Sequence, residues 1–117
     1  MRVQSVFVEE RSSAEDGHWF FAYQVNVLNE GAETVRLVSR HWVITDGNGQ
    51  EQEVRGAGVV GEQPVLTPGE SFEYTSACPL TTPVGSMHGS YQLVTDGGER
   101  FDAVIAPFGL GEPAAVH

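Results

Sequence analysis

Alternation of apolar and polar residues identifies several short segments of the chain as strands. In the clearest of them, residues 19–28, apolar side chains recur at every second position, with Gln24 and Asn26 between them. A repeat of two residues puts successive side chains on opposite faces, so this segment is predicted to be a strand with one buried face. That face consists of Trp19, Phe21, Tyr23, Val25 and Val27.

Weaker alternation predicts further strands downstream. It covers residues 70–76, where Phe72 and Tyr74 are the apolar positions, and then residues 91–93 and 101–105. The last two segments are separated by Asp96-Gly97-Gly98. Asp and Gly suit the backbone of tight turns, so these two segments are predicted to form a hairpin.

Residues 35–45 carry apolar side chains on both faces of the predicted strand. Leu37 and Val43 fall on one face, and Trp42 and Ile44 fall on the other. This pattern indicates a central strand, or a strand that meets a partner on its second face, with Trp42 as a core residue.

The fold class follows from the strands and from the turn signals between them. No segment shows a helical repeat of apolar residues, which argues against parallel βαβ architecture. About seven short strands favour an all-β, antiparallel sandwich of the immunoglobulin-like or fibronectin type III-like kind. Tyr91, near the start of a late strand, is a candidate tyrosine corner. Residues 1–117 are expected to form a single domain.

Charge narrows the classes of partner. The formal net charge is −10, and the six basic residues are all arginines. This balance argues against nucleic acid and anionic membranes as partners, because both require cations on the protein. Cations and basic protein surfaces are favoured instead. No segment resembles a signal peptide or a membrane span, so the expected location is the cytoplasm.

Residues that could perform chemistry are scattered. Cys78 is the only cysteine and is predicted to be a buried small hydrophobe. The four histidines form no ligand pair, so no metal site is predicted, although Asp46, Glu51 and Glu53 flank one turn and leave loose binding of a hard cation open. No nucleophile elbow, paired-carboxylate motif or activated cysteine is visible. The sequence predicts neither an enzyme nor a cofactor.

The segment 56–61 fits the pattern GxGxxG, which in dinucleotide-binding proteins lets the backbone approach a pyrophosphate. Two prolines follow and no helix is predicted there, so a Rossmann site is not indicated. A glycine-rich loop that crosses between sheets is the simplest interpretation. The alternative is an anion site in which Arg55 stands beside loop amides near Gly56, Gly58 and Gly61.

Arg40, His41 and Trp42 form a basic and aromatic cluster in an acidic chain. One interpretation is a core tryptophan with polar neighbours that point outward. The other is a partner-binding surface that uses Arg40 and Trp42, since Arg and Trp are over-represented at interface hot spots.

Consecutive blocks of the sequence resemble the bacterial ApaG family, over nearly the whole chain from Val3 to His117. The resemblance is carried by residues 40–49, 53–64, 66–70, 72–76 and 87–91, which include Arg40-His41-Trp42-Val43-Ile44-Thr45-Asp46-Gly47-Asn48-Gly49 and Met87-His88-Gly89-Ser90-Tyr91. It implies an immunoglobulin-like or fibronectin type III-like sandwich, and it brings neither an established enzymatic activity nor a catalytic residue.

The resemblance also implies a biological context. The family takes its name from genes beside that of diadenosine tetraphosphate hydrolase, and its mutants have been linked to cobalt resistance and magnesium efflux. Related domains occur in an F-box protein and in a polymerase-interacting protein, where an adaptor role is supposed. The family's glycine motif, discussed as a pyrophosphate-binding pattern, falls here on Gly56, Gly58 and Gly61.

The leading hypothesis is therefore a non-catalytic, cytoplasmic module that binds a protein partner, not yet identified, and is associated with Co²⁺/Mg²⁺ efflux or resistance. The alternative is a sensor that binds nucleotide polyphosphate or pyrophosphate through the glycine loop. Pairing of edge strands between two copies leaves a homodimer open as well.

Overall fold

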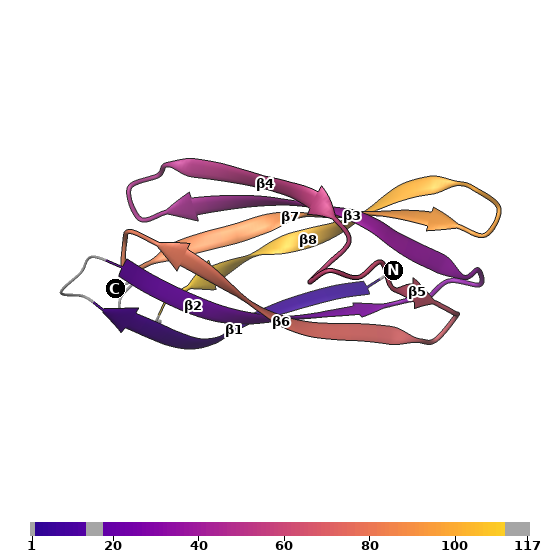
Figure 1. The fold of residues 1–117 in the computed structure, drawn as a ribbon, viewed down its shortest axis with the longest axis horizontal. Coiled ribbons are helices and arrows are strands. Elements are labelled where there is room, and N and C mark those ends of the chain that lie inside the picture. The colour runs from indigo at the N-terminus through magenta and orange to yellow at the C-terminus, as the bar shows by residue number, and fades with distance from the viewer. Residues whose placement is uncertain (1, 14–17, 112–117) are drawn as a thin grey trace.

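The computed structural model describes residues 2–13 and 18–111, and for residues 6–13 it describes the backbone alone. Within these residues the chain forms antiparallel strands arranged in two stacked sheets (Figure 1). The predicted all-β antiparallel sandwich is confirmed, with eight strands rather than about seven. They are β1 (Arg2–Ser13), β2 (His18–Leu28), β3 (Val35–Asp46), β4 (Glu51–Ala57), β5 (Val65–Leu66), β6 (Ser71–Leu80), β7 (Gly85–Thr95) and β8 (Arg100–Leu110).

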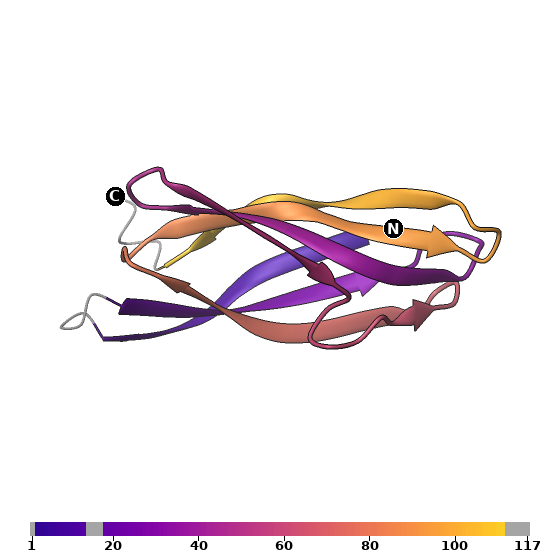
Figure 2. The same ribbon diagram turned by 45° about the horizontal axis from the view of Figure 1, so that its top comes forward.

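The two sheets differ in width. One sheet has the order β1-β2-β6, and the other has the order β4-β3-β7-β8, with the short β5 paired to the start of β3. The sandwich is elongated, with extents of 51 × 24 × 22 Å, and Figure 2 shows the two layers from a second direction. On one long side β1 packs against β8. On the other long side the edges are β4 and β6, which do not pack together in this way within the described residues.

Side chains from both sheets meet in one core between the layers. The predicted buried face of β2 is confirmed, since Phe21, Tyr23, Val25 and Val27 are at most 5% exposed and Trp19 is half-buried. The facing sheet contributes mainly aliphatic and aromatic side chains from β3, β7 and β8. These are Val35, Leu37, Trp42, Met87, Tyr91, Leu93, Ala103, Ile105 and Leu110.

The mixed pattern of β3 has a geometric cause. Leu37 pairs with Leu93 and Ser39 pairs with Gln92, so Val38 is an extra residue, a β-bulge, in the ladder with β7. A bulge shifts the alternation by one position, so the side chains on one face before it change parity after it. Leu37 is therefore buried before the bulge and Trp42 is buried after it. The predicted core position of Trp42 is confirmed.

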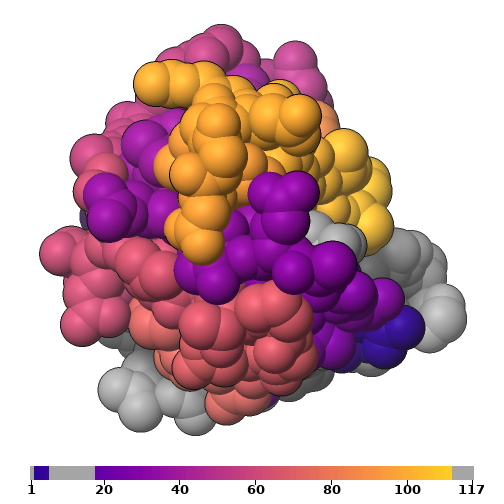
Figure 3. All heavy atoms as spheres, turned by 90° about the vertical axis from the view of Figure 1, so that its right-hand side faces the viewer, coloured from indigo at the N-terminus to yellow at the C-terminus, as the bar shows by residue number. Residues whose placement is uncertain are grey.

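One end of the sandwich is closed by turns from distant parts of the chain. Figure 3 looks onto this end, where the segment 29–34 lies between the segment 67–70 and the hairpin turn 95–99. The amide of Asp96 donates to the carbonyl of Thr34 at 3.1 Å, and Asn29, only 2% exposed, joins the segment 29–34 to the chain around residues 66–70. Its Nδ2 donates to the carbonyls of Glu33 and Leu66 at 2.8 and 3.0 Å, and its Oδ1 accepts from the amide of Gly31 at 3.0 Å.

Candidate functional site

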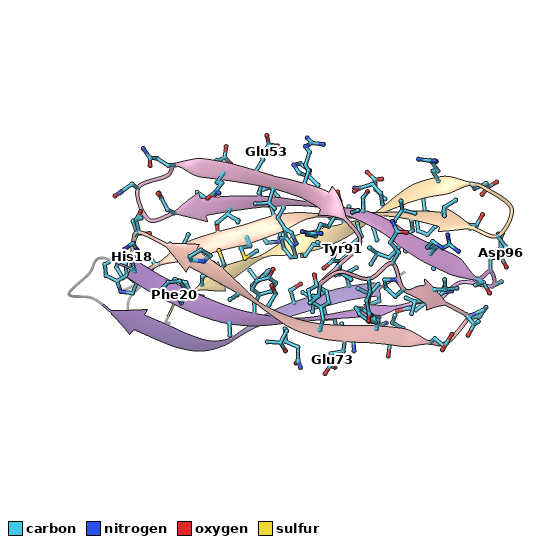
Figure 4. The ribbon with its side chains drawn as sticks, viewed as in Figure 1. His18, Phe20, Glu53, Glu73, Tyr91 and Asp96 are labelled. Carbon is cyan, nitrogen blue, oxygen red and sulfur yellow. The ribbon has the colours of Figure 1, made fainter. Side chains whose placement is uncertain are left out.

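Two adjoining cavities lie along the open side of the sandwich, between the edge strands β4 and β6. The larger has a volume of about 360 Å³ and the smaller about 240 Å³, and they share Ile44, Gln52 and Pro79. We call them together the β4–β6 groove. Its wall consists of His18, Tyr23, Arg40, Trp42, Ile44, Asp46, Gln50, Glu51, Gln52, Val54, Ser76, Ala77, Cys78, Pro79, Leu80, Thr81 and Met87. In Figure 4, His18 lies near the end of β6, and Tyr91 lies between the sheets.

The register of β3 and β4 decides which side chains face the groove. Arg40 pairs with Gly56, Trp42 with Val54, and Ile44 with Gln52. Residues directly opposite each other in an antiparallel pair point to the same face. These three pairs therefore form one stripe on the inner face of the sheet. A buried aromatic residue stands at its centre and a cation stands at one end.

Arg40 is held at its end of the groove by backbone carbonyls. Its Nη1 donates to the carbonyl oxygens of Ala57 at 3.0 Å and Gly58 at 2.9 Å. Gly56 leaves room for this arrangement, because a Cβ there would lie 2.9 Å from both Nη1 and Nη2. No carboxylate of the described residues lies within ion-pair distance of the guanidinium. The positive charge of Arg40 is thus fixed in place without a direct counter-ion.

The tyrosines near Arg40 are neutral at physiological pH. Burial raises the pKa of Tyr74 to about 12, although a hydrogen bond with Tyr91 and the nearby guanidinium of Arg40 oppose the shift. Burial also raises the pKa of Tyr23 and that of Tyr91, again against the charge of Arg40. Among Arg40 and these three tyrosines, only Arg40 is therefore charged.

Tyr91 has a different role from the one predicted. Its hydroxyl pairs with the hydroxyl of Tyr74, which lies on the facing sheet, whereas a tyrosine corner bonds to the backbone of its own connection. Tyr91 is fully buried and packs edge-on against Trp42, with ring centroids 6.2 Å apart. The pair joins the two sheets beneath the floor of the groove.

The structure separates the arginine of the predicted anion loop from the groove. Arg55 pairs with His41 and therefore lies on the outer face of the sheet, opposite to Arg40. Its side chain is 71% exposed, and its Nη2 lies 3.8 Å from Glu53, whose Oε1 is also 2.9 Å from Nε2 of His41. The Arg40-His41-Trp42 cluster is split in the same way, because His41 points outward.

The backbone geometry of the loop explains why glycine occupies positions 58 and 61 of the GxGxxG pattern. Gly58 has φ +59°, and a Cβ there would lie 2.0 Å from the carbonyl oxygen of Glu62. Val59 and Glu62 exchange backbone hydrogen bonds of 2.7 and 2.9 Å around Val60 and Gly61, whose φ angles are 47° and 79°. Positive φ at both central residues defines a type I′ turn.

The loop amides are largely used within the protein. The amide of Gly58 donates to the carbonyl of Val38 at 2.8 Å, and those of Val59 and Glu62 donate to each other's carbonyls. A nest for an anion needs successive amides that point at the ligand. These three amides are thus engaged within the protein, and the pyrophosphate site at Arg55, Gly56, Gly58 and Gly61 stays a prediction.

The predicted partner-binding pair has two different environments. Trp42 is 3% exposed and packs against Tyr23, Tyr91 and Phe108, so most of its side chain belongs to the core, and the remainder borders the smaller cavity. Arg40 is half-buried and borders the smaller cavity. Sequence reasoning did not predict the groove, although Gln52, Val54 and Gly56 at alternate positions of β4 are the signal for its second wall.

The remaining candidates for chemistry have ordinary environments. Cys78 is 2% exposed, and burial raises the pKa of its thiol to about 11, in agreement with the predicted small hydrophobe. Among residues 2–5 and 18–111, whose side chains are described, no three or more His, Cys, Asp or Glu gather as a metal site would require. The same residues contain no helix long and apolar enough to cross a membrane.

Comparison with known proteins places this sandwich in a family. The family model described as the ApaG domain matches residues 9–95. The chain belongs to the ApaG domain family. It is 60% identical to Protein ApaG of Bradyrhizobium sp. (strain ORS 278) over 111 residues, which cover 95% of this chain and 85% of that protein. Protein ApaG of Methylorubrum extorquens (strain PA1) is 61% identical over the same shares of the two chains.

A solved structure from the same family has the same architecture. The crystal structure of the putative ApaA protein from Bordetella pertussis matches with a TM-score of 0.87 and 49% identity, and the match covers 96% of this chain and 91% of that one. The resemblance found in the sequence is thereby confirmed, and the bacterial relatives agree with it.

Proposed function

We propose that this ApaG domain is a non-catalytic, cytoplasmic interaction module that binds a protein partner in the β4–β6 groove and through that partner takes part in Co²⁺/Mg²⁺ efflux or resistance. The observation that carries the proposal is the groove itself. It is an open cleft of two adjoining cavities, with an aromatic floor and a fixed cation at one end. The strand order also supports the expected fibronectin type III-like class, with three strands facing a sheet built around four.

The chemistry of the groove suits a polypeptide. Arg, Trp and Tyr are the residues that most often dominate binding energy at protein interfaces, and Arg40 and Tyr23 line the smaller cavity. Two edge strands border the groove, and edge strands present unpaired backbone groups to a neighbouring chain. Glu51, Glu53 and Arg55 place charges along β4, which opposes indiscriminate pairing of that edge with a second copy.

Site-specific photo-crosslinking tests the proposal. A benzoylphenylalanine at position 52 replaces Gln52, an exposed residue whose side chain lines both cavities. The matched control replaces Gln24, which lies on the outer face of β2 and bonds to Glu73. Position 52 should crosslink in cells to a recurrent protein that position 24 does not capture.

A steric variant gives the second measurement. Gln52→Trp should block the groove and abolish complex formation with the captured protein, whereas Gln24→Trp should leave it intact. Crosslinks that are equal at the two positions, or a complex that survives Gln52→Trp, would contradict the use of this groove. Size-exclusion chromatography with light scattering of the purified chain reports whether the captured protein is a second copy.

A further inference from the structure

The two ends of the β4–β6 groove carry opposite charges. Arg40 stands at one end, held by the carbonyls of Ala57 and Gly58. Asp46 lines the cavity at the other end, and alternation along β3 puts it on the same face as Arg40. Oδ1 of Asp46 is fixed by the amides of Asn48 and Gln50 at 2.8 and 3.0 Å, so this carboxylate is held in position. A ligand that fills the groove therefore contacts a cation at one end and a carboxylate at the other.

The distance between the charged ends can be counted along β3. Arg40 and Asp46 are six positions apart on one face of β3. At about 3.3 Å per residue, this corresponds to roughly 20 Å. An extended peptide covers that distance in about six residues. Because alternate side chains of such a peptide face the same way, the two side chains that enter the groove at its ends would be about six positions apart.

The surroundings of Arg40 favour a carboxylate of the ligand as its binding partner. Its two carbonyl bonds use Nη1, and a guanidinium carries five N–H donors, so Nη2 and Nε have donors to offer a ligand. The adjoining wall contains Val54 and Met87, which can contact methylene groups. A glutamate side chain combines an apolar stem with a planar carboxylate that matches the guanidinium fork.

We infer that the groove binds an extended segment of the partner protein, with an acidic residue at Arg40 and a basic residue about six positions away at Asp46. The inference rests on the proposed function and specifies which segment of a partner would be recognised. The net charge of −10 repels acidic peptides at long range. A preference for an acidic residue in the peptide must therefore come from a local cation. A preference for a basic residue alone would not identify a local site, because the net negative charge of the whole protein would also produce it.

Selection from a displayed library of random nine-residue peptides tests the inference on the full chain. Binders to the wild-type protein should be enriched in an acidic and a basic residue at the stated spacing. The acidic enrichment should disappear on Arg40→Gln and persist on Arg55→Gln, which removes the same charge from the outer face. In a selected peptide, Glu→Gln should weaken binding to the wild type about tenfold and weaken binding to Arg40→Gln little, as a coupled pair requires.

A second pair of variants leaves Arg40 and its carbonyl bonds untouched. Asp46→Asn removes the charge that lines the larger cavity but keeps an oxygen that can accept from the amides of Asn48 and Gln50. Asp102→Asn makes the same change at a residue that does not line the groove. Asp46→Asn retains the turn contacts and Asp102 is exposed, so both variants are expected to fold. Only Asp46→Asn should remove the enrichment of basic residues.

The outcomes separate the inference from the proposed function. Binders without acidic enrichment, binders that are the same on Arg40→Gln, or no binders at all would overturn the inference. If position 52 still crosslinks to a partner in any of these cases, the groove remains the interaction surface and only the charge pattern is wrong. If the crosslink also fails, the proposed function fails with it.

Discussion

The guanidinium of Arg40 occupies the space that a side chain at position 56 would need. A Cβ on Gly56 would lie 2.9 Å from Nη1 and Nη2 and 3.0 Å from Cζ. Gly56 and Arg40 are also directly paired across β3 and β4. The first glycine of the GxGxxG pattern thus makes room for the cation that fixes the carbonyls of the next two residues.

The glycines of this loop should differ in their sensitivity to alanine. Gly58→Ala would force a positive φ and a contact with the Glu62 carbonyl, and we expect it to lower the free energy of unfolding by about 3 kcal/mol or more. Gly61→Ala meets no neighbouring atom, so it should cost only the positive-φ penalty of about 1 kcal/mol. Urea denaturation of the variants measures these differences. Equal losses for the two variants would contradict the close approach seen at Gly58.

Gly56→Ala should have a different signature. The clashing atoms belong to the end of a flexible side chain, so the fold should survive with a loss of about 1 kcal/mol while Arg40 is displaced from Ala57 and Gly58. Amide NMR of the variant should therefore show shifts at residues 57 and 58, and selected peptides should lose affinity. Unchanged loop spectra in Gly56→Ala would contradict the contact.

Val60 occupies a position that disfavours a β-branched residue. Its φ is 47° at the first central position of the type I′ turn, and its side chain is 63% exposed. Asn is preferred there, so Val60→Asn is expected to stabilise the fold by about 1 kcal/mol and to raise the melting temperature. Val104→Asn is the control, because Val104 is 74% exposed in a regular strand and should gain nothing. Equal effects at both positions would exclude backbone strain as the cause.

The buried face of a strand was predicted correctly where apolar and polar residues alternate regularly, and it was ambiguous where they do not. The buried face of β2 was predicted correctly because alternation continues without interruption from Phe21 to Val27. The faces of β3 were ambiguous because the bulge at Val38 shifts the alternation, and the position of a bulge depends on the partner strand. The groove was not predictable, since it exists only because β4 and β6 lie at edges on the same side of the molecule.

The two arginines near the glycine motif also show that strand pairing cannot be read from local sequence. Arg55 is adjacent to Gly56 in sequence, yet it points away from the groove, whereas Arg40 reaches the loop from another strand. Local sequence indicated a cation beside the glycines, but pairing register decided which cation lies there. The family resemblance supplied the fold, and it supplied no side-chain geometry.

Asn29 should be among the most sensitive polar positions. Its amide satisfies two carbonyls and one backbone amide at a site that is 2% exposed. Asn29→Ala leaves these groups unpaired and is expected to cost about 2 to 4 kcal/mol. Asn29→Asp should cost at least as much, because a carboxylate cannot donate to the carbonyls of Glu33 and Leu66. Asn26→Ala, at an exposed hydrogen bond to Glu73, is the control and should change stability by less than about 1 kcal/mol.

The buried tyrosines predict a loss of stability in alkali. Burial raises the pKa of Tyr74 from 10.0 to about 12 and also raises the pKa of Tyr91. Above pH 10 the unfolded chain loses these protons while the folded chain keeps them, so ionisation favours the unfolded state. Each raised tyrosine therefore removes about 1.4 kcal/mol per pH unit, from pH 10 until its folded pKa is passed. The thiol of Cys78, whose pKa is raised from 9.0 to about 11, adds a similar loss that begins near pH 9.

Urea denaturation between pH 8 and pH 11 measures this dependence, with tyrosinate absorbance as the independent readout. The folded protein should show little tyrosinate near pH 10, although free tyrosine is half ionised there. Tyr74→Phe lowers stability at pH 8, because Tyr91 loses the partner of its hydroxyl, and it should make the decline above pH 10 shallower. Cys78→Ala should remove the loss that begins near pH 9 and should leave the tyrosine-dependent loss that begins near pH 10. A decline that is identical in the wild type and Tyr74→Phe would mean that the hydroxyl of Tyr74 is accessible to solvent, and that the two sheets are not joined there.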